Sequence, residues 1–201
     1  MPRLILASAS PRRQELLAQI GVRYQLAPQN IDESPRDGES PVELVRRLAE
    51  EKARAALAEN AEPEIVVLGS DTIVVHDGEI LAKPSSRQDA LRMLQLLSGS
   101  SHEVHTAVSL CSSDQQSTLL STTEVRFRPI SDAEAVAYWE SGEPEDKAGG
   151  YAIQGLAAVF VESIAGSYSG VMGLPLYETA QLLQQFGIDS WQHPDLDRGQ
   201  A

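Results

Sequence analysis

The sequence predicts an α/β protein, because strand-like and helix-like patterns alternate along the chain. Short apolar runs typical of buried strands, such as residues 3–7 and 65–68, are separated by amphipathic stretches with helical periodicity. Serine caps precede several of these stretches, and Asp77-Gly78 is a hairpin signal between two strand-like runs. Such a pattern is typical of a sheet flanked by helices.

The size and charge of the chain limit what it can be. Its 201 residues can bury one sizeable core, so we expect one domain over residues 1–188 and a flexible polar tail over 189–201. The sequence contains no run of about 18 apolar residues, the length needed to cross a bilayer, and its first apolar run is too short for a signal peptide. It therefore predicts a cytoplasmic protein without a membrane partner. A net charge of -13 argues against nucleic-acid binding, which needs a basic surface. Any phosphate site must therefore be local.

The first elements are marked by caps. Residues 3–7 are expected to form a buried strand that turns into a helix over 11–20. Ser10 suits the N-cap of this helix and Pro11 suits its first position. A second strand is expected over residues 22–27, followed by a polar loop.

The next helix has the strongest signal in the chain. Ser40 and Glu43 have the spacing of a capping box, which predicts a helix over 41–59. An apolar stretch over 65–75 then predicts a strand that carries Asp71. The second half is expected to contain, in order, a helix over 86–97, strands over 102–112 and 117–129, a helix over 132–141, an irregular surface loop over 142–155, a strand over 156–164, a glycine-rich loop over 166–173 and a last helix over 175–186.

The turn into the first helix could attract an anion, since the free N–H groups and the positive end of the helix meet there. Arg12 and Arg13 occupy early helical positions, where positive charge opposes the helix dipole, so helix stability does not explain them. An anionic ligand would explain them. Taken alone, the segment is equally compatible with a surface helix that carries two solvated arginines.

Asp71 and its neighbours could hold a metal. Asp71 follows an apolar strand, which suits a metal ligand or a general base, although a turn aspartate that accepts backbone hydrogen bonds is an alternative. The hairpin directs Lys83 back towards Asp71, but this lysine could also be simple protection of a strand edge. Glu33 lies in a loop that could reach a metal held by Asp71, since Mg²⁺ typically takes one or two carboxylates.

Other polar residues are ordinary when taken singly. Lys52 lies in the helix over 41–59, and residues 146–155 combine glycines that allow close approach with a charged pair and an amide. His102 and His105 are three apart on a predicted strand and should point to opposite faces, so they do not form a transition-metal site. The sequence has no GxxxxGK[ST], GxGxxG or GxSxG motif.

Several segments occur in a fixed order along the chain: Ser8-Ala9-Ser10-Pro11-Arg12-Arg13, Glu33, Glu51-Lys52-Ala53, Ser70-Asp71-Thr72-Ile73-Val74, Lys83-Pro84, the run from Asp146-Lys147 to Gln154-Gly155, and Gly173-Leu174-Pro175. Together they resemble the Maf family of nucleotide pyrophosphatases over about residues 3–187. The resemblance implies an elongated α/β fold with a twisted mixed sheet and two lobes with a central nucleotide cleft. It also implies hydrolysis of the bond between the α and β phosphates with a divalent metal, Mg or Mn.

The resemblance also assigns roles by position. It implies that Asp71 is the general base and that Glu33 helps to hold the metal or the attacking water, so both are candidate metal ligands. The residues implied to bind substrate are Ser8, Ser10, Arg12, Arg13, Lys52, Thr72, Lys83, Asp146, Lys147 and Gln154. Among these, Arg12, Thr72 and Gln154 match the specificity positions of the branch that acts on dTTP and UTP.

Three points stay open. In residues 167–171 the sequence departs from a common family form, in which an asparagine often precedes the valine. The family also suggests a homodimer. The alternative function is a nucleotide-sensing regulatory protein linked to cell division, with little hydrolysis.

Overall fold

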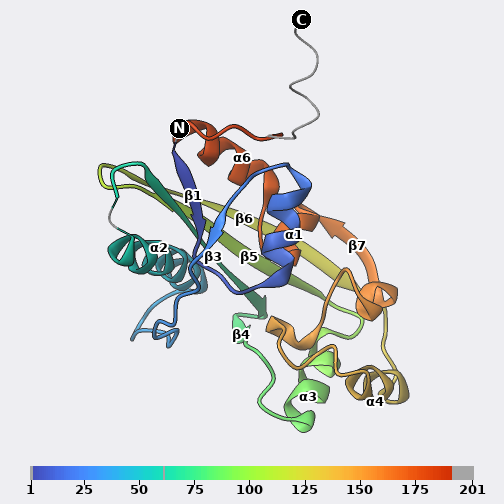
Figure 1. The fold of residues 1–201 in the computed structure, drawn as a ribbon. Helices are drawn as coiled ribbons and strands as arrows, with labels where there is room; N and C mark the ends of the chain where they lie inside the picture. The colour runs from blue at the N-terminus through green and yellow to red at the C-terminus, as the bar shows by residue number, and fades with distance from the viewer. Residues whose placement is uncertain (1, 61, 192–201) are drawn as a thin grey trace, which may run out of the picture.

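The computed structural model describes residues 2–60 and 62–191, which form one mixed seven-stranded sheet with helices on both faces (Figure 1). The strands are β1 (Arg3–Leu6), β2 (Gln25–Leu26), β3 (Ile65–His76), β4 (Glu79–Leu81), β5 (Ser101–Cys111), β6 (Gln116–Phe127) and β7 (Val161–Ala165). The helices are α1 (Pro11–Gln19), α2 (Pro41–Glu59), α3 (Arg87–Leu97), α4 (Asp132–Glu140), α5 (Tyr168–Met172) and α6 (Leu176–Gln185). These elements confirm the predicted α/β class.

The sheet has the order β2-β1-β3-β5-β6-β7, and β4 pairs with β3 outside this path. The pairs of β1 with β2 and β3 are parallel, and all other pairs are antiparallel. The predicted hairpin at Asp77-Gly78 is confirmed, with positive φ angles of 47° and 82° at its two residues. Among the described residues, no helix is long and apolar enough to cross a membrane.

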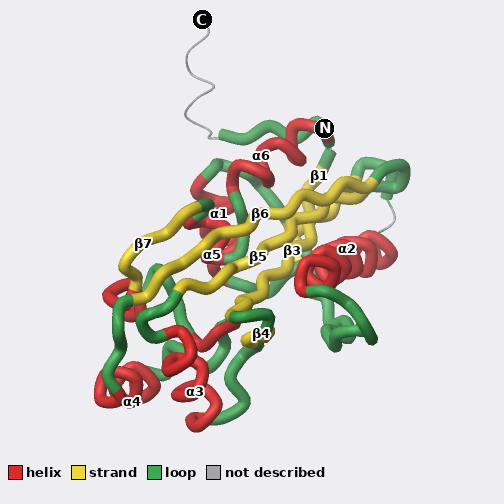
Figure 2. The backbone as a smooth tube through the Cα atoms, turned by 180° about the vertical axis from the view of Figure 1, so that it is seen from behind, coloured by secondary structure: helices red, strands yellow, loops and turns green. Residues whose placement is uncertain are grey.

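Alternation along β3 divides the core between the two faces of the sheet. Val67 and Ile73 pack on the side of α2, whereas Val66 and Leu68 pack with residues of α1 and α6 on the other side. Beyond β4, a separate cluster that includes Val74 joins the sheet to α3 and α4. The two ends of the elongated sheet therefore carry different helices, α1 and α6 at one end and α3 and α4 at the other, as Figures 1 and 2 show.

Close contact between α2 and β3 depends on Gly69. A Cβ atom at this position would lie 2.2 Å from the carbonyl oxygen of Ala49 and 2.7 Å from the amide nitrogen of Ala53. The helix begins at the predicted capping box, in which the amide of Glu43 donates to Oγ of Ser40 and the amide of Ser40 donates to the carboxylate of Glu43. Gly69 thus lets a well-defined helix lie directly against the middle of β3.

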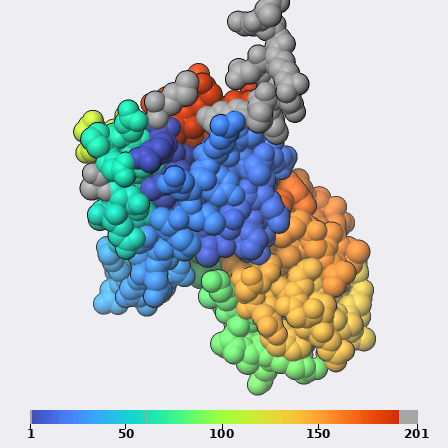
Figure 3. Space-filling view, in the orientation of Figure 1, coloured from blue at the N-terminus to red at the C-terminus, as the bar shows by residue number. Residues whose placement is uncertain are grey.

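The edge of β3 that faces β1 has a break in its pairing. β1 pairs with β3 as far as Leu68, and β4 begins to pair at Val74. Since β5 occupies the opposite edge over Val67–Val75, β1 and β4 must lie on the same edge. Within the described residues, 69–73 therefore have a strand partner on one side only. The space-filling view is indented between the blue N-terminal segments and the green segment of β4 and α3 (Figure 3).

Two predicted elements are shorter than expected. The strand predicted over residues 22–27 is confined to Gln25–Leu26, which pair with Ile5 and Leu6 at the end of β1. The strand predicted over 156–164 was wrong in its first half, where Leu156–Phe160 form a 3-10 helix and β7 follows at Val161.

The two glycine-rich loops contain more structure than their composition indicates. Residues 142–155 are not a surface loop throughout, because Tyr151 and Ile153 are buried and Ala148–Gly150 form a 3-10 turn. Apolar contacts with the cluster around α3 and α4 hold this segment in place. The second loop, residues 166–173, contains the short helix α5, which Ser167 caps by accepting from the amide of Gly170. Of the predicted tail, residues 192–201 lie outside the described residues.

Candidate active site

Lys52 connects two acidic side chains beside the break in the edge of β3. Its Nζ atom lies 2.7 Å from Oδ1 of Asp71 and 2.6 Å from Oε1 of Glu33. Lys52 and Asp71 are each 8% exposed, whereas the Glu33 side chain is 52% exposed. Because 2.6 Å and 2.7 Å separate the two carboxylate oxygens from one nitrogen, these oxygens are at most 5.3 Å apart. A buried cation therefore holds two carboxylates close together.

The surroundings of Glu33 are electropositive. Partial burial acts to raise the pKa of Glu33, but the hydrogen bond and charge of Lys52, together with the charges of Lys83 and Arg13, outweigh it. The pKa of Glu33 is therefore below its ordinary value, and the group is ionised at neutral pH. The charge of Lys83, an exposed residue that follows the hairpin, therefore acts on Glu33.

Arg13 contacts three separate parts of the chain on the face of β3 opposite to Lys52. Its Nε atom donates to the carbonyl oxygen of Gly173 at 2.8 Å, Nη1 donates to Oγ of Ser8 at 3.1 Å, and Nη2 approaches Oγ1 of Thr72 at 3.4 Å. Burial lowers the pKa of Arg13, although the negative charges of Asp71 and Glu33 act in the other direction. A fixed set of acceptors thus holds the guanidinium, and the charges of the acidic pair act on it.

The start of α1 leaves backbone donors available. Ser10 is at the N-cap as predicted, but its side chain makes no capping hydrogen bond, and its amide donates to Oγ of Ser8 at 3.2 Å. Pro11 at the first position has no N–H group to satisfy. No side chain caps the amide donors of the first turn, so these donors and the positive end of the helix remain available to an anion.

Two residues of the segment after α4, Asp146 and Lys147, lie near the start of α1. Asp146 forms an ion pair with Lys147. Partial burial acts to raise the pKa of Asp146, but Lys147 and the charge of Arg12 lower it overall, which indicates that Arg12 lies near this pair. Gln154 is exposed, and the structure gives it no hydrogen bond to any other candidate residue in the described part of the chain. Of the predicted residues, Gln154 alone is not connected to the others by a contact or a charge effect.

Comparison with known proteins identifies the family. The family model described as "Maf-like protein" matches residues 3–186. The chain belongs to the Maf family. A curated relative from Alkalilimnicola ehrlichii, named dTTP/UTP pyrophosphatase, is 54% identical over 96% of both chains. Relatives with the same name from Saccharophagus degradans and Vibrio parahaemolyticus are 51% and 53% identical, over 94% and 91% of this chain and 91% and 96% of theirs.

Three groups in this Maf protein support the site without having been singled out as candidates. Ser70 is fully buried, and its hydroxyl lies within hydrogen-bond distance of the carbonyl oxygens of Gly173 and Ala107. Thr106 is the direct neighbour of Thr72 on β5, and their hydroxyl oxygens are 3.0 Å apart. The carbonyl of Gly173 accepts from both Arg13 and Ser70. Only the strand register could have revealed Thr106, whereas Ser70 and Gly173 belong to segments that carried the resemblance.

The donor set of the acidic pair fits a hard divalent cation. Mg²⁺ typically takes one or two carboxylates from the protein and completes its coordination with substrate oxygens and water. Glu33 and Asp71 supply two carboxylates, and Lys52 already shows that a positive group is favoured between them. The described residues contain no group of three or more histidine, cysteine or acidic side chains that could hold a metal unaided.

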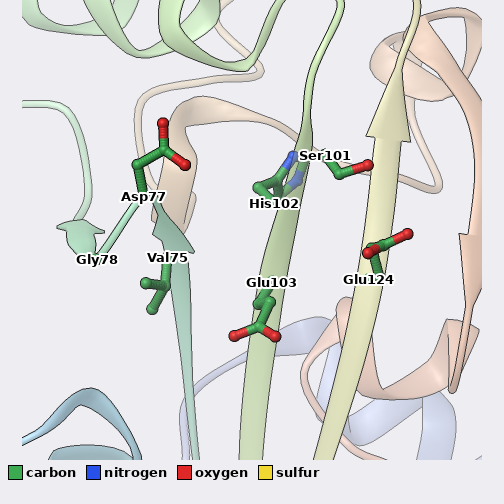
Figure 4. Close-up of a pocket in the computed structure, with 7 residues that line it drawn as sticks. All are labelled: Val75, Asp77, Gly78, Ser101, His102, Glu103 and Glu124. Carbon is green, nitrogen blue, oxygen red and sulfur yellow. The ribbon is translucent and has the colours of Figure 1, made fainter.

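A pocket at the far end of the sheet has different chemistry (Figure 4). It is lined by Val75, Asp77, Gly78, Ser101, His102, Glu103 and Glu124. Glu103 and Glu124 are direct cross-strand neighbours, and the lining contains neither lysine nor arginine. Such a surface repels phosphate groups, so it is not a candidate nucleotide site.

Proposed function

We propose that the chain is a nucleoside triphosphate pyrophosphatase that converts dTTP and UTP to the monophosphate and pyrophosphate. The observation that carries this proposal is the position of Lys52 between Asp71 and Glu33, with Arg13 close to the same break in the sheet edge. The names of three relatives that are 51–54% identical, dTTP/UTP pyrophosphatase, support the choice of reaction and of substrates. The protein is highly acidic, with a net charge of -13, so the clustered cations mark an exception that a triphosphate would explain.

Binding of the triphosphate is assigned to the cationic side chains and to the turn before α1. Arg13 can donate to phosphate oxygens in a fixed orientation, because its guanidinium is already held by Ser8 and Gly173. Further positive charge would come from Arg12, Lys83 and Lys147, and further donors from the first turn of α1 and the hydroxyl of Ser10. Asp146 is expected to orient Lys147.

Cleavage is assigned to water activated by the acidic pair. Asp71 would accept a proton as the water oxygen forms its bond to the α-phosphorus, and the bond from that phosphorus to the oxygen bridging to the β-phosphate would break, releasing pyrophosphate. Glu33 and Asp71 would hold the divalent metal, Mg or Mn, which would neutralise phosphate charge and favour ionisation of the water. Lys52 would keep both carboxylates in position.

Selection of the base is assigned to Thr72, Arg12 and Gln154. Thr72 is partly exposed at the break in the β3 edge, and Thr106 and Arg13 fix the place of its hydroxyl. Gln154 offers an amide that can both donate and accept.

A cytoplasmic location and a homodimer remain predictions, which cell fractionation and light scattering would test.

Replacement of Asp71 tests the proposed mechanism. Asp71→Asn should lower kcat about a hundredfold or more, because the amide cannot take the proton, while leaving nucleotide binding nearly intact. The matched control is Asp77→Asn, which changes an exposed aspartate in the hairpin turn of the same strand pair and should have wild-type activity. Turnover near that of the wild type in Asp71→Asn would remove Asp71 from this role.

A further inference from the structure

The loop that carries Glu33 has almost no apolar anchorage. This loop connects β2 to α2, and residues 32–38 are all exposed. It contains no helix or strand, and its local structure is limited to the turn at Asp37-Gly38 and a few hydrogen bonds between near neighbours, such as that from the amide of Ser34 to Asp32. The carboxylate of Glu33 must reach Lys52 and the metal site. Its position therefore depends on polar contacts made by the rest of the loop.

Arg47 of α2 supplies most of these contacts. Its Nε and Nη2 atoms donate to the two carboxylate oxygens of Glu39 at 2.6 Å and 2.8 Å, which is a bidentate pair. Nη2 also donates to the carbonyl oxygen of Ser34 at 3.0 Å, and Nη1 donates to Glu51 on the next turn of α2 at 3.1 Å. Arg47 thus grips the loop at two points and is itself held by the helix.

The burial of the Arg47–Glu39 pair distinguishes it from the pair that Arg36 of the loop forms with Glu51. The side chains of Arg47 and Glu39 are 12% and 9% exposed. By contrast, the side chain of Arg36, which pairs with Glu51, is 66% exposed, so water and salt weaken that contact. The contact with Ser34 matters most for position, because Ser34 directly follows Glu33 in the chain.

We propose that Arg47 is a positioning residue, which holds the loop so that the carboxylate of Glu33 is presented to Lys52 and to the metal site. The proposal rests on the function proposed above for Glu33. Arg47 and Lys52 belong to the same helix, so the helix fixes both ends of the arrangement, Arg47 through Ser34 and Lys52 through Glu33. Arg47 itself touches no reacting group.

A double-mutant cycle separates this role from a general effect on stability. Arg47→Met should lower kcat/KM by about tenfold to a hundredfold in the wild-type background, as expected for a displaced catalytic group. In a Glu33→Gln background the same change should alter kcat/KM by less than about twofold, because the group that Arg47 positions is already lost. An equal loss in both backgrounds would overturn the proposal. Arg47→Lys keeps the positive charge but loses the two parallel donors of the guanidinium, so it should be more active than Arg47→Met and less active than the wild type.

The control for this cycle is Arg54→Met. Arg54 lies two turns further along α2, pairs with Glu50 and Gln116, and touches no residue of the loop. It should leave kcat/KM unchanged. If the turnover of Glu33→Gln is too low to measure the double-mutant cycle, the Mg²⁺ concentration that gives the half-maximal rate is measured instead. This concentration should rise at least about fivefold in Arg47→Met and stay unchanged in Arg54→Met.

Proteolysis gives a readout that does not depend on activity. Arg36 is an exposed trypsin site within the loop, so Arg47→Met should be cut there faster than the wild type or Arg54→Met. If Arg47→Met does not fold, Glu39→Gln replaces it in every comparison, since it removes the same pair from the side of the loop. Unchanged cleavage would contradict the proposal. A wild-type protein that releases no pyrophosphate would instead refute the proposed function.

Discussion

The ammonium of Lys52 lies 2.7 Å from the carboxylate of Asp71, across the contact that Gly69 permits between α2 and β3. Both groups are nearly buried, so water solvates neither charge well. Each charge therefore depends on the other for its stabilisation. This pair makes stability and activity depend on the same contact.

Lys52→Met should therefore affect both properties. Removal of the lysine leaves the buried charge of Asp71 without its partner, so the free energy of unfolding should fall by about 3 kcal/mol, and kcat/KM should fall about a hundredfold. The double variant Lys52→Met/Asp71→Asn should regain part of the lost stability but none of the activity. Urea unfolding and pyrophosphate release measure the two effects. Equal stability of the single and double variants would show that the pair is not coupled.

The two arginines of the first turn should respond differently to replacement. Arg13→Lys loses the three directed contacts with Gly173, Ser8 and Thr72, so it should lower the melting temperature and reduce kcat/KM about a hundredfold. Arg12 has no hydrogen bond or ion pair within the described residues, so Arg12→Lys should raise KM and leave the melting temperature unchanged. Steady-state kinetics and thermal unfolding on the same samples make the comparison. The same loss of stability in both variants would contradict this assignment.

His102 should make the protein less stable in mild acid. Burial, with a smaller effect of His76, lowers the pKa of His102 from 6.5 to about 4. The unfolded chain therefore binds a proton more readily than the folded one, and stability is lost as the pH falls from about 6.5 towards 4. Between pH 7 and pH 5 this group should cost about 2 kcal/mol of unfolding free energy. Urea unfolding of His102→Gln should show a weaker pH dependence in this window, and an unchanged slope would exclude His102 as the cause.

Elements with local signals were predicted well from the sequence. The capping box at Ser40 and Glu43 and the hairpin at Asp77-Gly78 depend on residues within a few positions of one another, and both are confirmed. The burial of Tyr151 depends instead on His102, which is 49 positions away and bonds its hydroxyl at 2.8 Å. No pattern inside residues 142–155 could have indicated that contact.

The site shows the same division. The Ser-x-Ser turn and the unusual arginines of α1 were visible as local anomalies, and the family resemblance ordered the remaining residues. The hydrogen bond from Arg13 to Gly173 joins residues that are 160 positions apart. The contact of Thr106 with Thr72 can be predicted only when the register of β3 and β5 is known. The anchorage of the Glu33 loop by Arg47 could not be predicted from the sequence, because Arg47 bonds Glu39 and Ser34, 8 and 13 positions away, across a loop without regular structure.

The most direct test of the central claim is pyrophosphate release by the purified protein from a panel of canonical and modified nucleoside triphosphates, with Mg²⁺ or Mn²⁺. The proposed function predicts release from dTTP and UTP with kcat/KM at least about tenfold above that for purine nucleotides, and loss of release in Asp71→Asn. Binding of nucleotides without release would favour the sensor instead. A preference for purines would contradict the assignment of dTTP and UTP.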